Sequence, residues 1–86
     1  MEIEDLRTFV EVADAGGVTS AAQRLGISKS MVSRRIARLE TDLGAQLLAR
    51  TTRGIALTEA GATFRDYAAR ISAEMDAARE TILPGW

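Results

Sequence analysis

Apolar residues recur at helical spacing along most of this chain and alternate at strand spacing in one short stretch. A first helix is predicted from residue 4 to about residue 15, with an apolar face made of Leu6, Phe9, Val10 and Ala13. Gly16 and Gly17 follow and predict its end. Because Phe9 lies on the apolar face, we expect it in the core rather than in a binding site.

Two further helices are predicted next, joined by a turn at Gly26. Thr19 or Ser20 can cap the first of them, and Gly26 can take the left-handed conformation that ends it. Ser28 can accept a hydrogen bond from the first turn of the second helix. The buried stripe of that helix contains Val32, Ile36, Leu39 and Leu43. The pattern therefore predicts a helix-turn-helix over about residues 18–38.

The opposite face of the second helix carries short and basic side chains. At about 100° per residue, this face contains Ser30, Arg34, Ala37, Arg38 and Thr41, flanked by Met31 and Ser33. Short side chains let a helix approach base edges closely, and arginine offers a pair of donors to guanine. The acids Glu40 and Asp42 come only in the last turn. The face favours a DNA-reading helix over an ordinary basic surface helix.

After Gly44 the apolar period changes to that of strands. Residues 46–58 predict two short strands around a turn near Arg53. The side chains expected to point inward are Leu47 or Leu48, Ile55 and Leu57. Arg50 and Arg53 bracket the tip, where a positive side chain can meet phosphate or enter a narrow minor groove. A solvated loop is the alternative, but the position directly after the DNA-reading helix favours a wing.

A long helix is predicted from residue 59 to residue 83, with Thr58 as its N-cap and no proline before Pro84. Its continuous apolar stripe contains Ala60, Phe64, Tyr67, Ile71, Met75, Ala78 and Ile82. A helix of about 25 residues reaches roughly 37 Å, more than three short helices can cover. Burying each large side chain gains about 1.5–3 kcal/mol, so we infer a homodimer through the stripe from Phe64 to Ile82. A later domain that covers the stripe is the alternative.

The composition limits the chemistry that the chain can perform. Its 86 residues, 47% of them hydrophobic, suffice for one compact core. The sequence contains no cysteine and no histidine, which removes disulfides, the usual zinc ligands, an imidazole base and thiol nucleophiles. We therefore expect no metal site, no cofactor in this fragment and no enzymatic activity. Without a signal peptide or an apolar run of roughly 18 residues, we expect a cytoplasmic location and no membrane contact.

The net charge is −1 and the pI is near 5.4, but the charges are unevenly distributed. Residues 18–54 contain seven bases and two acids, a net charge of +5. The flanking residues 1–17 and 55–86 carry −4 and −2. Because salt screens charges beyond about 8–10 Å, the local basic region governs contact with phosphate more than the distant acids do.

The order of elements and several short motifs resemble the N-terminal domain of the LysR-type transcriptional regulators. The resemblance extends to about Leu83. The motifs that carry it are Leu6-Arg-Thr-Phe9, Ala21-Ala22-Gln-Arg-Leu25, Ser28, Val32-Ser33-Arg34, Ile36-Ala-Arg-Leu-Glu40, Leu43-Gly44, Leu47-Leu-Ala-Arg50 and Leu57-Thr-Glu-Ala-Gly61. Where the family often has glutamine-proline, this chain has Lys29-Ser30, so the resemblance does not give the base preference.

The resemblance implies a mainly α fold. A winged helix-turn-helix of three helices and a two-stranded wing would occupy residues 1–58, and a linker helix for dimerisation residues 59–83. Members of the family bind inverted-repeat promoter sites as dimers or tetramers, and they continue into a domain that senses a small co-inducer. We therefore expect residues 84–86 to begin the hinge, and the effector domain to be absent from this chain.

The resemblance and the helical pattern together give a set of expected DNA contacts. Thr19 and Ser20 would meet phosphate, and Arg38 the DNA backbone. The side chains expected in the major groove are Lys29, Ser30, Met31, Ser33 and Arg34. Arg50 and Arg53 would serve the wing. The second hypothesis is a winged-helix protein-interaction module whose basic face binds an acidic partner.

Overall fold

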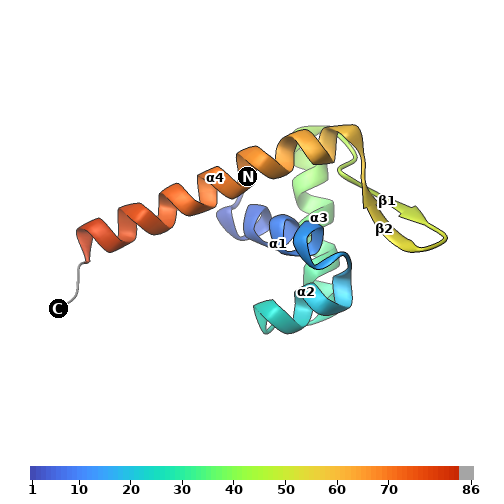
Figure 1. The fold of residues 1–86 in the computed structure, drawn as a ribbon, viewed down its shortest axis with the longest axis horizontal. Helices are drawn as coiled ribbons and strands as arrows, with labels where there is room; N and C mark the ends of the chain where they lie inside the picture. The colour runs from blue at the N-terminus through green and yellow to red at the C-terminus, as the bar shows by residue number, and fades with distance from the viewer. Residues whose placement is uncertain (84–86) are drawn as a thin grey trace.

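The computed structural model describes residues 1–83 as four helices and one hairpin. In chain order these are α1 (Ile3–Ala15), α2 (Val18–Leu25), α3 (Lys29–Leu43), β1 (Leu48–Thr51), β2 (Gly54–Leu57) and α4 (Glu59–Ile82). α1 contacts the other three helices, while the hairpin and the far end of α4 project from opposite sides of the molecule (Figure 1). The predicted winged helix-turn-helix is confirmed, and the expected hinge at 84–86 lies outside the described residues.

Three of the predicted turns and caps are confirmed. Ser28 begins α3, and its Oγ accepts a hydrogen bond from the backbone N–H of Met31 at 3.0 Å. Thr58 begins α4 in the same way, with the N–H of Gly61 donating to its Oγ1 at 2.9 Å. Gly26 ends α2 with a φ of 69°, in the left-handed region that glycine adopts without a steric penalty. Local capping thus sets where both long helices begin.

The start of α2 differs from the prediction. The helix begins at Val18, and its N-cap is Gly17, which makes no side-chain capping bond. Thr19 and Ser20 lie inside the first turn and neither of them is the cap. The reason is that Gly16 already ends α1, and α2 starts directly after the glycine pair.

The core lies where α1 meets α2, α3, the base of the hairpin and α4. Its buried apolar residues are Leu6, Phe9, Val12, Ala21, Ala22, Val32, Ile36, Leu39, Leu47 and Ala68. Phe9 is fully buried, as predicted, and its ring centroid lies 6.0 Å from that of Phe64 on α4. The predicted stripe of α3 is buried from Val32 to Leu39, whereas Leu43 is half-buried at the end of the helix.

Two polar side chains of α1, Asp5 and Thr8, are completely buried. Buried polar groups are costly unless they form hydrogen bonds, and both of these do. Asp5 accepts two hydrogen bonds from Arg38. The hydroxyl of Thr8 donates to the carbonyl of Glu4 at 2.7 Å and accepts from Nη1 of Arg35 at 3.3 Å. α1 thereby holds two arginines of α3.

The two strands of the hairpin are antiparallel, with Leu48 opposite Leu57 and Arg50 opposite Ile55. Residues directly opposite each other share one face of the sheet. Leu47, just before β1, is buried, and Leu48 and Ile55 are half-buried. Leu57 is exposed, which corrects the expectation that it points inward. Leu48 and Ile55 line a groove against α3, whereas Leu57 lies outside that groove.

The hairpin returns to the start of α4 through close backbone contact. The N–H of Thr58 donates to the carbonyl of Leu47 at 3.0 Å, and its hydroxyl donates to the carbonyl of Gln46 at 2.6 Å. Gly61 lies so close that a Cβ at this position would overlap the carbonyl oxygen of Leu47. Only glycine fits there without displacement of the backbone.

α4 is 24 residues long and runs antiparallel to α1. Arg7 and Asp76 form an ion pair at 2.7 Å, and Arg65 and Asp14 form another at 2.8 Å. Ala68 is fully buried between these pairs. The last turns of α4 extend beyond α1, and the molecule measures 48 × 25 × 18 Å along its principal axes. Within residues 1–83, no helix combines the length and apolar character that a membrane crossing requires.

Candidate nucleic-acid interface

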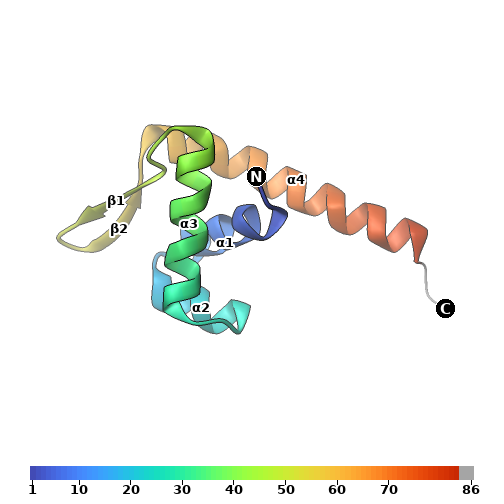
Figure 2. The ribbon, with the colours of Figure 1, turned by 180° about the vertical axis from the view of Figure 1, so that it is seen from behind.

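One side of α3 is open to solvent. Figure 2 shows α3 in front of α1, with no other helix crossing before it. The side chains of this side line a shallow hollow: Lys29, Ser30, Ser33, Arg34 and Ala37. All five are exposed, as predicted. Because Ser30, Ser33 and Ala37 are short, the helix surface itself is accessible to a ligand, and Arg34 can reach beyond it.

Arg38 is exposed, as predicted, but it also has a partner on α1. Its Nε and Nη2 each donate a hydrogen bond of 2.7 Å to the carboxylate of Asp5, which is completely buried on α1. These hydrogen bonds stabilise the charged guanidinium and raise the pKa of Arg38 above its ordinary value. The helical pattern of α3 predicts only which residues share a face of that helix, so it could not reveal a partner on α1. A contact of Arg38 with DNA stays a prediction.

Sequence reasoning also missed the neighbouring link between α1 and α3. Arg35 is half-buried, and its guanidinium donates to Thr8 rather than to solvent alone. A signal was present in α1, because Asp5 precedes the buried Phe9 by four residues and therefore lies on the same helical face. A polar residue on a buried face requires a partner, and basic residues of α3 are suitable ones.

The hairpin carries Arg50 on β1 and Arg53 in its turn, and both are exposed. The turn is held by Thr51, whose hydroxyl donates to the carbonyl of Gly54 at 3.3 Å and accepts from the N–H of Arg53 at 3.2 Å. Arg53 is thereby placed at the tip, as predicted.

A groove lies between α3 and the hairpin and connects their basic surfaces. Its walls are formed by Val18, Ser33, Ile36, Ala37, Glu40, Gln46, Leu48, Ala49, Arg50 and Ile55. Ser33 and Ala37 line both this groove and the hollow on α3. The two surfaces are therefore continuous, with Arg34 at the hollow and Arg50 at the groove.

Ion pairs divide the basic side chains into two groups. The first group is neutralised by carboxylates within 4 Å and contains Arg7, Arg24, Arg38 and Arg65. The second group has no such carboxylate among residues 1–83. It contains Arg70 and Arg79 on α4, Arg35 at the contact of α3 with α1, and four exposed members on α3 and the hairpin: Lys29, Arg34, Arg50 and Arg53. Uncompensated positive charge gathered on one surface attracts a polyanion.

The remaining predicted contact residues lie at the edges of this surface. Thr19 and Ser20 are in the first turn of α2, where helix N–H groups favour anions. Met31 is half-buried, so it is less accessible than Ser30 or Arg34. Contacts of these side chains with DNA stay predictions.

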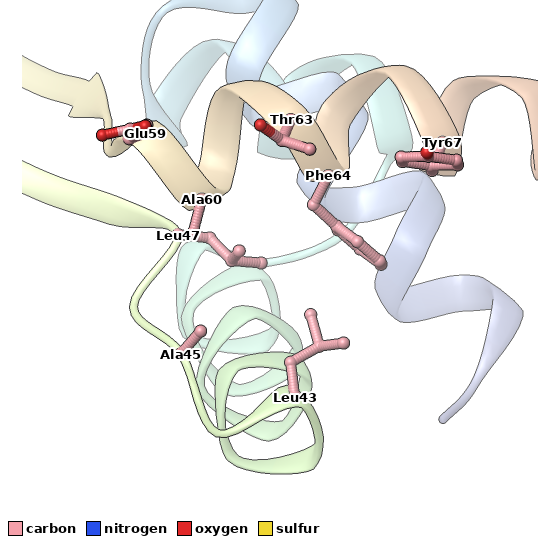
Figure 3. Close-up of a pocket in the computed structure, with 8 residues that line it drawn as sticks. All are labelled: Leu43, Ala45, Leu47, Glu59, Ala60, Thr63, Phe64 and Tyr67. Atoms are coloured by element: carbon pink, nitrogen blue, oxygen red, sulfur yellow. The ribbon is translucent and has the colours of Figure 1, made fainter.

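α4 exposes a row of large apolar side chains, as its stripe predicts. Tyr67, Ile71, Met75 and Ile82 are 55%, 46%, 44% and 71% exposed. Phe64, expected in the same row, packs instead against the core beside Phe9, because α1 reaches this part of α4. The row begins at an apolar hollow where Leu43, Leu47 and Phe64 point toward one another (Figure 3).

The helices and the hairpin described above match a known protein family. The family model described as "Bacterial regulatory helix-turn-helix protein, lysR family" matches residues 3–62. The match begins with α1, includes the hairpin and ends in the first turn of α4. The chain belongs to the lysR family.

Relatives of this lysR-family chain are longer proteins. An HTH-type transcriptional regulator of Xanthomonas campestris pv. campestris (strain 8004) is 44% identical over 81 residues, which are 94% of this chain and 24% of the relative. The HTH-type transcriptional regulator TfdT of Cupriavidus pinatubonensis is 51% identical over 73 residues, 85% of this chain and 32% of TfdT. The chain thus spans about a quarter to a third of these relatives. Both names describe regulators rather than enzymes, in agreement with the expectation from composition.

Two solved structures of similar domains contain DNA. The CbnR_DBD-DNA complex superposes with a TM-score of 0.82 at 41% identity and covers 95% of this chain and 99% of that one. The BenM_DBD/catB site 1 DNA complex superposes with a TM-score of 0.87 at 36% identity and covers 100% of both chains. The winged helix-turn-helix described above is therefore the fold of lysR-family DNA-binding domains.

Proposed function

We propose that this chain is the DNA-binding domain of a transcriptional regulator and binds double-stranded DNA with sequence specificity. In this proposal α3 is the recognition helix in the major groove, and the hairpin is the wing, whose arginines reach the backbone or the minor groove. The observation that carries it is the continuous surface of Lys29, Arg34, Arg50 and Arg53, which have no carboxylate partner among residues 1–83. Membership of the lysR family supports the same conclusion.

Base contacts are assigned to the outer side of α3. Arg34 would donate two hydrogen bonds to guanine, the pairing that its planar fork favours. Ser30 and Ser33 are short enough to let the helix approach and can bond to more than one base. Met31 would contact a thymine methyl group at the edge of the same surface.

Backbone contacts are assigned to the residues around these base contacts, since phosphate contacts set the register of a domain on DNA. They are Thr19, Ser20, Lys29, Arg50 and Arg53. Arg38 could add only Nη1, because its other two nitrogens bond to Asp5. The binding proposed here uses no metal and no cofactor.

The exposed row on α4 supports a homodimer through this helix. Tyr67, Ile71, Met75 and Ile82 leave apolar surface in water, and burial against a second copy would gain about 1.5–3 kcal/mol for each side chain fully covered. Ala78 lies in the same row and would let the two helices approach closely. A dimer of this kind matches a pseudo-palindromic promoter site, with one recognition helix for each half-site.

Further parts of the proposal concern a longer protein of this family. A tetramer, and a small-molecule co-inducer bound by another domain, would belong to that protein and not to residues 1–86. Because its ligand is chromosomal DNA, the protein would act in the cytoplasm.

Binding of the 86-residue chain to random and selected duplexes tests the proposal. By fluorescence anisotropy at low salt, a random duplex should bind, because phosphate contacts need no particular sequence. Duplexes selected from a random pool should bind about 10³-fold more tightly or better. A protein-interaction module would enrich no duplex sequence. Failure to bind any duplex at low salt would contradict the proposal.

A further inference from the structure

Glu40 on α3 connects the recognition helix to the base of the wing. Its Oε2 accepts hydrogen bonds from the backbone N–H groups of Leu47, at 2.7 Å, and of Leu48, at 3.2 Å. Leu47 is buried, and Leu48 is the first residue of β1. Glu40 and Arg50 also line the same groove between α3 and the hairpin. A single carboxylate oxygen therefore holds the start of the wing.

Among residues 1–83, these two are the only hydrogen bonds between a side chain of α3 and the hairpin segment. The other fastening of the hairpin is to the start of α4, where Thr58 bonds to the backbone of Gln46 and Leu47. Loss of the bonds to Glu40 would leave the wing attached to α4 but free to change its angle to α3.

A carboxylate at this position is unfavourable for the proposed function on electrostatic grounds alone. It lies beside a surface that binds phosphate, and an acid there repels the same ligand. Two N–H dipoles directed at Oε2 offset part of its charge. The reach of this side chain to both N–H groups of the wing explains Glu40 here, whereas contact with DNA does not.

We propose that Glu40 is a positioning residue that sets the distance and angle of the wing relative to the recognition helix. The inference rests on the proposed function, because it requires Arg53 to contact DNA while α3 occupies the major groove. Glu40 itself does not touch DNA in this arrangement. It acts through the placement of Arg53.

Two conservative variants separate the geometry of Glu40 from its charge. Because both hydrogen bonds end on one oxygen, the amide oxygen of E40Q can accept them without the charge. E40D keeps the charge but shortens the side chain by one methylene group, so its oxygen no longer reaches both N–H groups. A positioning role predicts that E40Q resembles the wild type and that E40D does not. A role through charge predicts the reverse.

A double-mutant cycle combines R53A with each Glu40 variant. Fluorescence anisotropy measures the affinity of each protein for a selected duplex. R53A should weaken binding in the wild type and in E40Q by the same factor. In E40D that factor should be smaller by at least about twofold, the lower end of coupling between interacting residues. R34A is the matched control, because its penalty reports the recognition helix and should be equal in all three backgrounds.

The outcomes distinguish the inference from the function on which it rests. An R53A penalty of equal size in the wild type, E40Q and E40D overturns the positioning role and leaves the wing contact intact. No R53A penalty in the wild type overturns the wing contact and the inference together. Amide hydrogen exchange adds a readout without DNA: the N–H groups of Leu47 and Leu48 should lose protection in E40D and keep it in E40Q, and unchanged protection in E40D contradicts the proposal.

Discussion

At the scale of single residues, Arg34 and Arg38 lie one helical turn apart on α3 but have different surroundings. Arg34 forms no ion pair or hydrogen bond among residues 1–83, whereas Arg38 is tied to the buried Asp5. The first is available to a ligand, and the second belongs to the packing of α1 on α3. Substitution of each should therefore affect a different property.

R34A should weaken binding to the selected duplex by about 1–3 kcal/mol and relax the preference at one base pair, because a base contact is lost. Anisotropy titrations with duplexes that vary at single positions measure both effects. An equal loss on every sequence, random duplex included, would make Arg34 a phosphate contact and contradict its base-reading role.

R38A should instead lower the melting temperature, because it leaves the carboxylate of Asp5 buried without its partner. Circular dichroism during heating measures the change, and R34A is the matched control with an expected midpoint equal to that of the wild type. A melting temperature unaffected by R38A would show that the pair with Asp5 contributes nothing to folding.

Residue-level features could be predicted from the sequence where the partners are close in the chain. Ser28 and Thr58 cap helices through an N–H three residues later, and Gly26 ends a helix within the same turn. Arg38 and Asp5 are 33 residues apart, and only the packing of α1 on α3 brings them together. The sequence pattern could therefore place the arginine on a face but not identify its partner.

At the scale of elements, the hairpin and α4 meet at Gly61. G61A should lower the free energy of unfolding by about 1–3 kcal/mol, because the added methyl group overlaps the carbonyl oxygen of Leu47 and forces the backbone apart. Urea denaturation measures the loss. G17A is the control, since Gly17 has extended backbone and a methyl group added there would meet no heavy atom within 4 Å. Equal losses for both variants would contradict the close contact.

α4 supplies the prediction about association. The proposed dimer should become a monomer in sedimentation velocity when I71D is introduced, because an aspartate in the exposed row would be buried without a partner in that dimer. A73D is the matched control: it adds the same charge on the opposite side of the helix and should leave the dimer intact. A dimer that survives I71D would disprove pairing through this row.

The elements themselves could be predicted well, because their apolar periods are long and regular. Two parts required the structure. Phe64 continues the stripe of α4, yet it packs on Phe9, since the course of α1 decides which part of the stripe is covered. Leu57 continues the alternation of the hairpin, yet it is exposed, because the groove against α3 is lined by Leu48 and Ile55 but not by Leu57.

At the scale of the whole molecule, a net charge of −1 coexists with a positive surface on α3 and the hairpin. Affinity for DNA should therefore depend strongly on salt. For a dimer that neutralises six to ten phosphates, it should fall roughly 10³–10⁵-fold between 50 and 200 mM salt, because bound counterions are released. Anisotropy titrations across this range measure the slope of log affinity against log salt concentration. R53A should reduce the magnitude of this slope by about one for each chain. A flat response would exclude phosphate contacts.

The antiparallel packing of α4 on α1 has a consequence for the operator. Arg7–Asp76 and Arg65–Asp14 fasten the two helices at separate points, and α1 also contacts α3. The direction in which α4 leaves the body is thus fixed relative to the recognition helix. In a pair of chains joined along α4, this fixed direction would set the distance between the two recognition helices. An operator whose half-sites have a different spacing would have to bend to bind both, because the packed helices leave little freedom for the distance to change.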